Sequence, residues 1–96
     1  MKVKYSAKAL DCIEGIGHYL QSNNLDDGFI SRYLTELKTS INKALSVFPE
    51  SGHEIKIKNT ILRRLVVKGH VVLYKYEPNK QLIDIAYLHK QNLPRI

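Results

Sequence analysis

Residues 61–90, ILRRLVVKGHVVLYKYEPNKQLIDIAYLHK, contain three short runs rich in β-branched and aromatic residues. The runs cover 61–67, 71–76 and 82–88, separated by Lys68-Gly69 and by Pro78-Asn79-Lys80. Such residues favour strands, and short turns between them join strands that run antiparallel. The segment therefore predicts a three-stranded antiparallel meander.

Just before the meander, Ile55 and Ile57 alternate with Lys56 and Lys58. Alternation of this kind suits a short fourth strand, because successive side chains of a strand point to opposite faces. The same residues also suit a basic loop, and the sequence leaves both alternatives open.

Two amphipathic helices are expected upstream. Ser6 stands where a helix N-cap is needed, and apolar residues, Leu10 and Ile13 among them, follow at spacings of three and four until Asn23-Asn24. Asp26 or Asp27 can cap a second helix, which Pro49 and Gly52 end. Its apolar stripe consists of Ile30, Leu34, Leu37, Ile41, Leu45 and Phe48.

A first strand is predicted around Val3 and Tyr5, which alternate with lysines. The expected fold is thus α+β: an N-terminal strand, an antiparallel helical hairpin, and a three- or four-stranded antiparallel sheet packed against the hairpin. We expect residues 1–96 to form one domain that is folded throughout apart from the last few residues. One face of the sheet should be covered by the helices, which leaves the other as the working surface.

Charge is concentrated in the second half of the chain. Residues 1–48 hold six bases and five acids (+1), and residues 49–96 hold nine bases and four acids (+5), which gives +6 in total. Such a field attracts polyanions or an acidic protein partner, although it also fits a merely basic soluble protein. No apolar run approaches the roughly 18 to 20 residues of a membrane span, and no secretory signal is present, so we expect a cytoplasmic protein.

The two arginines of the first meander strand, Arg63 and Arg64, must point to opposite faces. At most one can reach the open face, and the other must lie near an edge or pair with an acid, because a lone buried guanidinium is too costly. In the last strand, strict alternation places Ile83, Ile85, Tyr87 and His89 on one face, so that Tyr87 and His89 project together at the strand end.

A phenol, an imidazole and a cation could perform acid-base chemistry on RNA, with Arg63, Arg64 or Lys75 as the cation. The alternative is that Tyr87 packs under the helices and His89 is solvated. The remaining tyrosines at 5, 19, 33 and 74 fit apolar stripes and are expected in the core. Cys12 is expected to be a plain helix thiol. The histidines show no metal-ligand spacing and no phosphate-binding loop is present, so no metal, cofactor or small-molecule ligand is expected.

Several segments together resemble the RelE/ParE superfamily of bacterial toxins. They are the opening VKYSAKALDCIEGIGHYL, the FPESG that closes the second helix, Arg63-Arg64 within ILRRLVV, the strand HVVLYKYE and the ending LIDIAYLHK. The resemblance covers nearly the whole chain. It implies a strand, a helical hairpin and an antiparallel sheet in this order, and a cognate antitoxin that wraps an extended or helical segment around the toxin.

The branches of this superfamily differ in target. RelE-like members cut mRNA in the ribosome, whereas ParE-like members poison DNA gyrase and are associated with plasmid stabilisation. The ending Leu88-His89-Lys90 looks more like the ParE type, and Val71 and Val72 stand where the family often has a basic residue. The resemblance therefore favours a gyrase inhibitor over an enzyme. The positive charge of the second half of the chain favours Arg63, Arg64, Lys75 and Lys90 as target-binding residues.

Three alternatives stay open at this point. A RelE-like ribosome-dependent mRNA endonuclease would use Arg64, Tyr87 and His89 as catalytic residues. A chain of this type can also have lost its toxicity and survive as an antitoxin-binding module. Outside the family, a small basic nucleic-acid binder would show binding that weakens steeply with salt.

Overall fold

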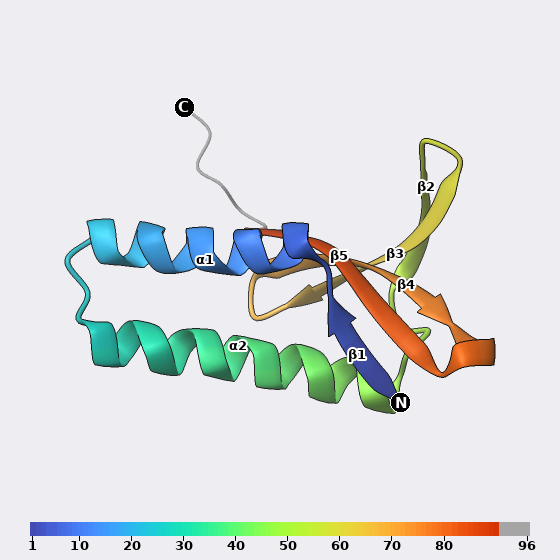
Figure 1. The fold of residues 1–96 in the computed structure, drawn as a ribbon, viewed down its shortest axis with the longest axis horizontal. Helices are drawn as coiled ribbons and strands as arrows, with labels where there is room; N and C mark the ends of the chain where they lie inside the picture. Colours follow the sequence, from blue (N-terminus) through green and yellow to red (C-terminus); the bar gives the residue numbers. More distant parts are fainter. Residues whose placement is uncertain (91–96) are drawn as a thin grey trace.

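The computed structural model describes residues 1–90, in which strands and helices form two layers (Figure 1). The order of elements confirms the expected strand, helical hairpin and sheet, and it shows that the segment around Ile55 is a strand. The elements are β1 Lys2–Tyr5, α1 Ala7–Ser22, α2 Asp27–Val47, β2 His53–Ile57, β3 Thr60–Val67, β4 His70–Glu77, a 3-10 turn Pro78–Lys80, and β5 Leu82–Lys90.

Both helices begin at side-chain caps. The Ser6 hydroxyl accepts a hydrogen bond from the Ala9 backbone nitrogen at 3.0 Å, and the Asp26 carboxylate accepts one from Phe29 at 2.8 Å. A cap of this kind pairs a backbone N–H that the first helical turn leaves free. The sequence prediction of Ser6 is confirmed, and Asp26, not Asp27, caps α2.

The helices bury narrower faces than their apolar stripes suggested. The buried residues are Ala9, Ile13 and Gly17 on α1 and Leu37, Ile41 and Leu45 on α2. Leu10 is 49% exposed and Tyr19 is 55% exposed, so their predicted burial is wrong. Phe48 is 67% exposed because α2 has ended at Val47 and the chain turns away there.

The five strands form one sheet in the order β1-β5-β4-β3-β2. Neighbours from β2 to β5 are antiparallel, whereas β1 runs parallel to β5. Two-residue turns join β2 to β3 and β3 to β4, and all four turn residues, Lys58-Asn59 and Lys68-Gly69, have positive φ. This is the type I′ geometry, whose twist matches that of the paired strands.

A bulge in β5 reverses the direction of the side chains that follow it. Tyr74 lies opposite Ile85 and Leu73 lies opposite Tyr87, which leaves Ala86 without a partner on β4. The prediction that Ile83 and Ile85 share a face with Tyr87 and His89 is therefore wrong, because one extra residue shifts the alternation. Leu88, not Tyr87, joins the buried core.

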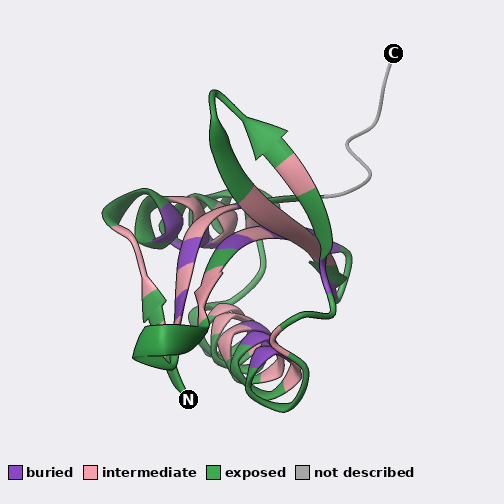
Figure 2. Cartoon of the chain, turned by 90° about the vertical axis from the view of Figure 1, so that its right-hand side faces the viewer, coloured by how far each residue is buried: buried purple, intermediate pink, exposed green. Residues whose placement is uncertain are grey.

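The core lies between the helices and one face of the sheet. In Figure 2, the buried residues lie where the helices and strands face each other, and the far end of the β2–β3 hairpin is exposed. Ser6 helps to hold these layers together, since its hydroxyl donates to the Ala86 carbonyl at 2.9 Å while it caps α1. The core consists of Ala9, Ile13, Leu37, Ile41, Leu45, Val67, Val72, Tyr74, Ile83, Ile85 and Leu88.

β1 is fastened to α2 by one side-chain contact. Tyr5 donates its hydroxyl to the Asn42 side-chain oxygen at 2.8 Å. Burial raises the pKa of Tyr5 to about 12, so the phenol keeps its proton and remains a donor.

Candidate functional site

The sheet face turned away from the helices brings together residues from three strands. Arg64 on β3 lies opposite Leu73 on β4, and Leu73 lies opposite Tyr87 on β5. The next cross-strand set on the same face consists of Val66, Val71 and His89. Directly opposite residues of antiparallel strands share a face. We call these six residues the open face.

Tyr87 and His89 form one polar side of the open face on β5, across β4 from Arg64 on β3. The rings of Tyr87 and His89 are 5.7 Å apart, and the Lys8 amine from α1 lies 5.7 Å from the Tyr87 ring centre, within cation–π range. The His89 Nδ1 lies 3.1 Å from the carbonyl oxygen of Lys90. Lysine, phenol and imidazole are therefore contiguous there.

The centre of the open face is apolar. Val66 is 37% exposed, Leu73 is half-buried, and Val71 is buried. Arg64 is half-buried at the border, where His53 of β2 is its cross-strand partner. The face therefore combines an apolar middle with cationic and aromatic groups around it.

Two contributors to this surface, Lys8 and His53, were missed by the sequence analysis. Lys8 belongs to a helix, and the alternation of side chains along a strand cannot predict that a helical residue contacts Tyr87. His53 precedes the segment in which alternation was recognised. Only the pairing of β2 with β3 places it next to Arg64.

Lys75 lies two residues beyond Leu73, on the same side of β4. The pairing of β3 with β4 ends at Arg63 and Tyr74, so no β3 residue stands opposite Lys75. Its cross-strand partner on β5 is Asp84, and its amine lies 3.9 Å from the Glu77 carboxylate. Its side chain is 52% exposed, with the Glu77 carboxylate near its charge.

Arg63 lies on the other face and fastens the α2–β2 connection. Its Nη1 donates to the carbonyl oxygens of Glu50 at 3.0 Å and Gly52 at 2.8 Å. Its Nη2 lies 3.7 Å from the Glu50 carboxylate and 3.5 Å from that of Glu54. The side chain is only 20% exposed. The sequence could not show which of the two arginines reaches the open face. In the structure it is Arg64, and Arg63 lies on the other face.

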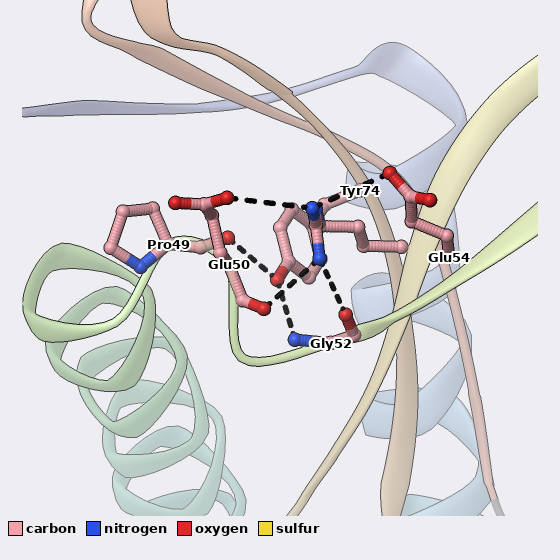
Figure 3. Close-up of polar contacts among 6 residues, drawn as sticks. Pro49, Glu50, Gly52, Glu54 and Tyr74 are labelled. Atoms are coloured by element: carbon pink, nitrogen blue, oxygen red, sulfur yellow. Dashed lines mark hydrogen bonds and ion pairs between the residues drawn. The ribbon is translucent and has the colours of Figure 1, made fainter.

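The Tyr74 hydroxyl also holds the α2–β2 connection, between Pro49 and Gly52 (Figure 3). Its hydroxyl accepts a hydrogen bond from the Gly52 backbone nitrogen at 3.0 Å and donates one to the Pro49 carbonyl at 2.8 Å. Because Tyr74 is fully buried, these bonds anchor the end of α2 to the middle of the sheet.

A second candidate site is an apolar groove of about 430 Å³ between α1 and the adjoining ends of β4 and β5. Lys90 lies at this groove with its amine 5.3 Å from the ring centre of Tyr19, and its neighbour His89 lines both the groove and the open face. We call this site the α1 groove; its lining residues are Cys12, Gly15, Ile16, Tyr19, Leu20, Tyr33, His70, Leu88, His89 and Lys90.

The α1 groove contains a buried imidazole with one free nitrogen. His70 is 3% exposed, and its Nε2 lies 2.9 Å from the Tyr33 hydroxyl. No partner within residues 1–90 reaches its Nδ1. Burial, and then the positive charge of Lys90, lowers the pKa of His70. The ring is therefore held neutral, with unused hydrogen-bonding capacity at a groove wall.

The described residues contain neither a cluster of metal-ligand side chains nor a helix suited to a membrane. Within residues 1–90, no group of three or more His, Cys, Asp or Glu side chains is arranged to hold a metal ion. In the same part of the chain, neither helix is long and apolar enough to cross a membrane.

Comparison with known proteins gives three matches. The family model described as "ParE toxin of type II toxin-antitoxin system, parDE" matches residues 3–92. The "Putative toxin Y4kP" of Sinorhizobium fredii is 24% identical over 92 residues, which cover 94% of this chain and 91% of the relative. The RelE-RelB complex of Pyrococcus horikoshii contains a chain of similar fold, with a TM-score of 0.53, 18% identity, and coverage of 95% and 94% of the two chains.

Proposed function

Because this chain belongs to the ParE family of toxins of type II toxin-antitoxin systems, whose model spans residues 3–92, we propose that it acts on DNA gyrase and that a cognate antitoxin holds it inactive. The open face is the target surface in this proposal. The α1 groove receives part of the antitoxin.

The composition of the open face carries the proposal. Val66, Val71 and Leu73 form an apolar middle, and Arg64, Tyr87 and His89 border it. Protein interfaces have this arrangement, with an apolar centre inside a polar rim and with arginine and tyrosine enriched. A surface that stabilises a developing phosphate charge needs several cations instead, and this face offers few.

The position of Arg63 also favours a protein-binding surface over one that stabilises a phosphate charge. Its guanidinium is committed to the carbonyls of Glu50 and Gly52 and lies beside two carboxylates. Lys75 also has a carboxylate, that of Glu77, close to its amine. Of the four residues predicted to bind the target, Arg64 is the one that borders the apolar middle, so we assign it the main role in gyrase binding.

The α1 groove suits a segment of an acidic, partly apolar partner. Its walls are largely aliphatic and aromatic, Lys90 supplies a cation, and the Nδ1 of His70 has unused hydrogen-bonding capacity. An antitoxin segment that placed apolar side chains in the groove and a carboxylate beside Lys90 would use these features. The net charge of +6 would steer such a partner toward the toxin.

One observation favours a second candidate function, mRNA cleavage. Arg64, Tyr87 and His89 come from two strands and share the open face, with the two rings 5.7 Å apart. In this alternative the imidazole and phenol exchange protons with the reacting hydroxyls, and Arg64 neutralises the charge that develops on phosphorus. Ribosome-dependent cleavage that is lost in His89→Ala would establish it.

Binding of purified gyrase to two charge-reversal variants tests the target surface. Arg64→Glu reverses the charge of the open face, and Arg32→Glu makes the same change on the exposed part of α2. The proposal predicts at least tenfold weaker gyrase binding for Arg64→Glu alone, about 1.4 kcal/mol. Equal affinities in the two variants would refute the open face as the contact.

Growth of cells expressing the chain separates the remaining alternatives. The proposal predicts growth arrest that co-expressed antitoxin relieves. A chain that leaves growth untouched and still binds antitoxin is an inactive antitoxin-binding module. Retention on DNA with steep salt dependence, without gyrase inhibition, identifies a simple nucleic-acid binder.

A further inference from the structure

β2 forms an outer edge of the sheet, and the hairpin that contains it extends away from the helices (Figure 1). Four of its five residues are exposed, and Ile57 is 40% exposed. An edge strand presents unpaired backbone groups to any strand that can align with it. The edge at β1, by contrast, is a four-residue strand tied to α2 through Tyr5 and Asn42.

The turn between β2 and β3 determines which backbone groups of β2 are free. Ile57 lies opposite Thr60 across the two-residue Lys58-Asn59 turn. Residues that flank such a turn exchange both of their backbone hydrogen bonds, and every second pair repeats this pattern. Ile57, Ile55 and His53 therefore bond to β3. The N–H and C=O groups of Glu54 and Lys56 point outward.

The order of side chains along this edge is self-complementary. If a second β2 lies antiparallel to the first about a two-fold axis through Ile55, Glu54 of each copy stands opposite Lys56 of the other. The same alignment makes Glu54 and Lys56 the hydrogen-bonded pairs, in agreement with their outward backbone groups. Opposite charges at directly facing positions stabilise strand pairing, and like charges oppose it. On the other face, Ile55 meets its own copy.

From these features we propose that β2 is a self-association surface through which two copies of this chain join their sheets edge to edge. The contact is isologous, because the same five residues serve both copies. It lies on a different element from the α1 groove, and it leaves Arg64 of each copy on a shared, enlarged open face. The proposal does not depend on the identity of the toxin's target.

The size of the contact sets the strength of the dimer. One strand pair with its neighbouring side chains buries less than the roughly 1,200 Å² of standard stable interfaces. We therefore expect a dissociation constant on the order of 0.1 mM, which leaves a monomer in dilute solution and a dimer when the chain is concentrated.

Sedimentation of the purified full chain over a wide range of concentration tests the proposal, with Lys56→Pro as the first variant. Proline removes the outward N–H of Lys56 and adds a ring at the edge, yet it removes no hydrogen bond to β3. Dimerisation should weaken at least tenfold, while the thermal transition shows that the fold is retained.

If Lys56→Pro disturbs the strand, exchanging the charges of Glu54 and Lys56 provides an independent test of the dimer. Lys56→Glu places like charges opposite each other and should abolish the dimer, and the double variant Glu54→Lys/Lys56→Glu should restore it. In the double variant Arg63 loses its ion pair with Glu54 but keeps the Glu50 and Gly52 carbonyls as acceptors, so the thermal transition again checks that the fold is retained.

Three results would overturn the proposal. The chain could stay monomeric at millimolar concentration, or it could form a dimer that ignores all of these substitutions. In the third, amide exchange at Glu54 and Lys56 slows only when antitoxin is added, which would assign the edge to the antitoxin instead of a second copy.

Discussion

Arg63 and Arg64 are consecutive in the sequence but lie on opposite faces of β3. Arg63 donates to the carbonyl oxygens of Glu50 and Gly52 at 3.0 and 2.8 Å, whereas Arg64 stands opposite Leu73 on the open face. The two residues carry the same charge and differ in what they contact. Substitutions of the two residues can therefore be compared directly, with Arg63 expected to affect stability and Arg64 expected to affect activity.

Alanine at these two positions should have opposite consequences. Arg63→Ala leaves two carbonyl groups without their charged donor, and the free energy of unfolding should fall by about 1–3 kcal/mol. Arg64→Ala should change it by less than about 0.5 kcal/mol and reduce gyrase inhibition. Urea unfolding measures the first effect and supercoiling the second. If Arg64→Ala were the more destabilising variant, the assignment of the two faces would be wrong.

The contact between Tyr74 and Gly52 predicts a second pair of stability effects. Tyr74→Phe deprives the Gly52 N–H and the Pro49 carbonyl of their buried partner, which should cost about 1–3 kcal/mol. In Gly52→Ala, the new Cβ would lie 2.9 Å from the Tyr74 hydroxyl, and this overpacking should cost a similar amount, about 1–3 kcal/mol.

Two control variants check that these losses are specific. Tyr76→Phe removes a phenol that has no hydrogen bond within residues 1–90, and Gly15→Ala adds a Cβ with nothing within 4 Å of it. Tyr76→Phe should be nearly neutral, and Gly15→Ala should stabilise α1 by about 0.5–1 kcal/mol. Equal stability of Tyr74→Phe and Tyr76→Phe would contradict the anchoring role of Tyr74.

The buried imidazole of His70 should make stability depend on pH. Burial and the charge of Lys90 lower the pKa of His70 from 6.5, so the folded chain binds this proton less readily than the unfolded chain. The stabilisation is present above about pH 6.5 and is lost as the pH falls through the lower folded pKa.

Comparison with His70→Leu isolates this effect from the other histidines. Unfolding free energies measured from neutral pH down to about pH 5 should fall more steeply for the natural chain than for the variant. The variant also lacks the contact with Tyr33, so its slope with pH, not its absolute stability, is the diagnostic quantity. Identical slopes would show that His70 is not the titrating group.

Filling the α1 groove should weaken the antitoxin complex. Gly15 lines the groove, and a Cβ added there has nothing within 4 Å of it, so Gly15→Leu is expected to occupy the groove without disturbing α1. We expect at least tenfold weaker antitoxin binding by calorimetry, about 1.4 kcal/mol. Gln21→Leu makes a similar change on the exposed surface of the same helix, outside the groove, and should bind normally. Full affinity in Gly15→Leu would place the antitoxin elsewhere.

Features governed by short-range sequence were predictable. Ser6 caps α1, Asn23 ends it, and Lys68-Gly69 forms a tight turn, because each depends on a few neighbouring residues. For α2 the sequence offered Asp26 or Asp27, and the structure selects Asp26. The order of strands and helices, and with it the fold class, followed from such signals. The family resemblance is confirmed by the family model.

Features that depend on distant contacts were not predictable. Strand alternation cannot anticipate the unpaired Ala86, so it placed Tyr87 on the same face as Ile85. It also gave Arg63 and Arg64 opposite faces without showing which one the α2–β2 connection would occupy. Lys8 joins Tyr87 only because α1 crosses that end of the sheet.

The most direct test of the central claim is DNA supercoiling by purified gyrase with this protein titrated in, scored for lost supercoiling and for trapped cleaved DNA. We predict inhibition with trapped breaks, weakened at least tenfold by Arg64→Glu and unchanged by Arg32→Glu, a difference of about 1.4 kcal/mol. Undiminished supercoiling at a large molar excess of protein would contradict gyrase as the target. Ribosome-dependent mRNA cleavage that requires Arg64, Tyr87 and His89 would then be the activity to measure.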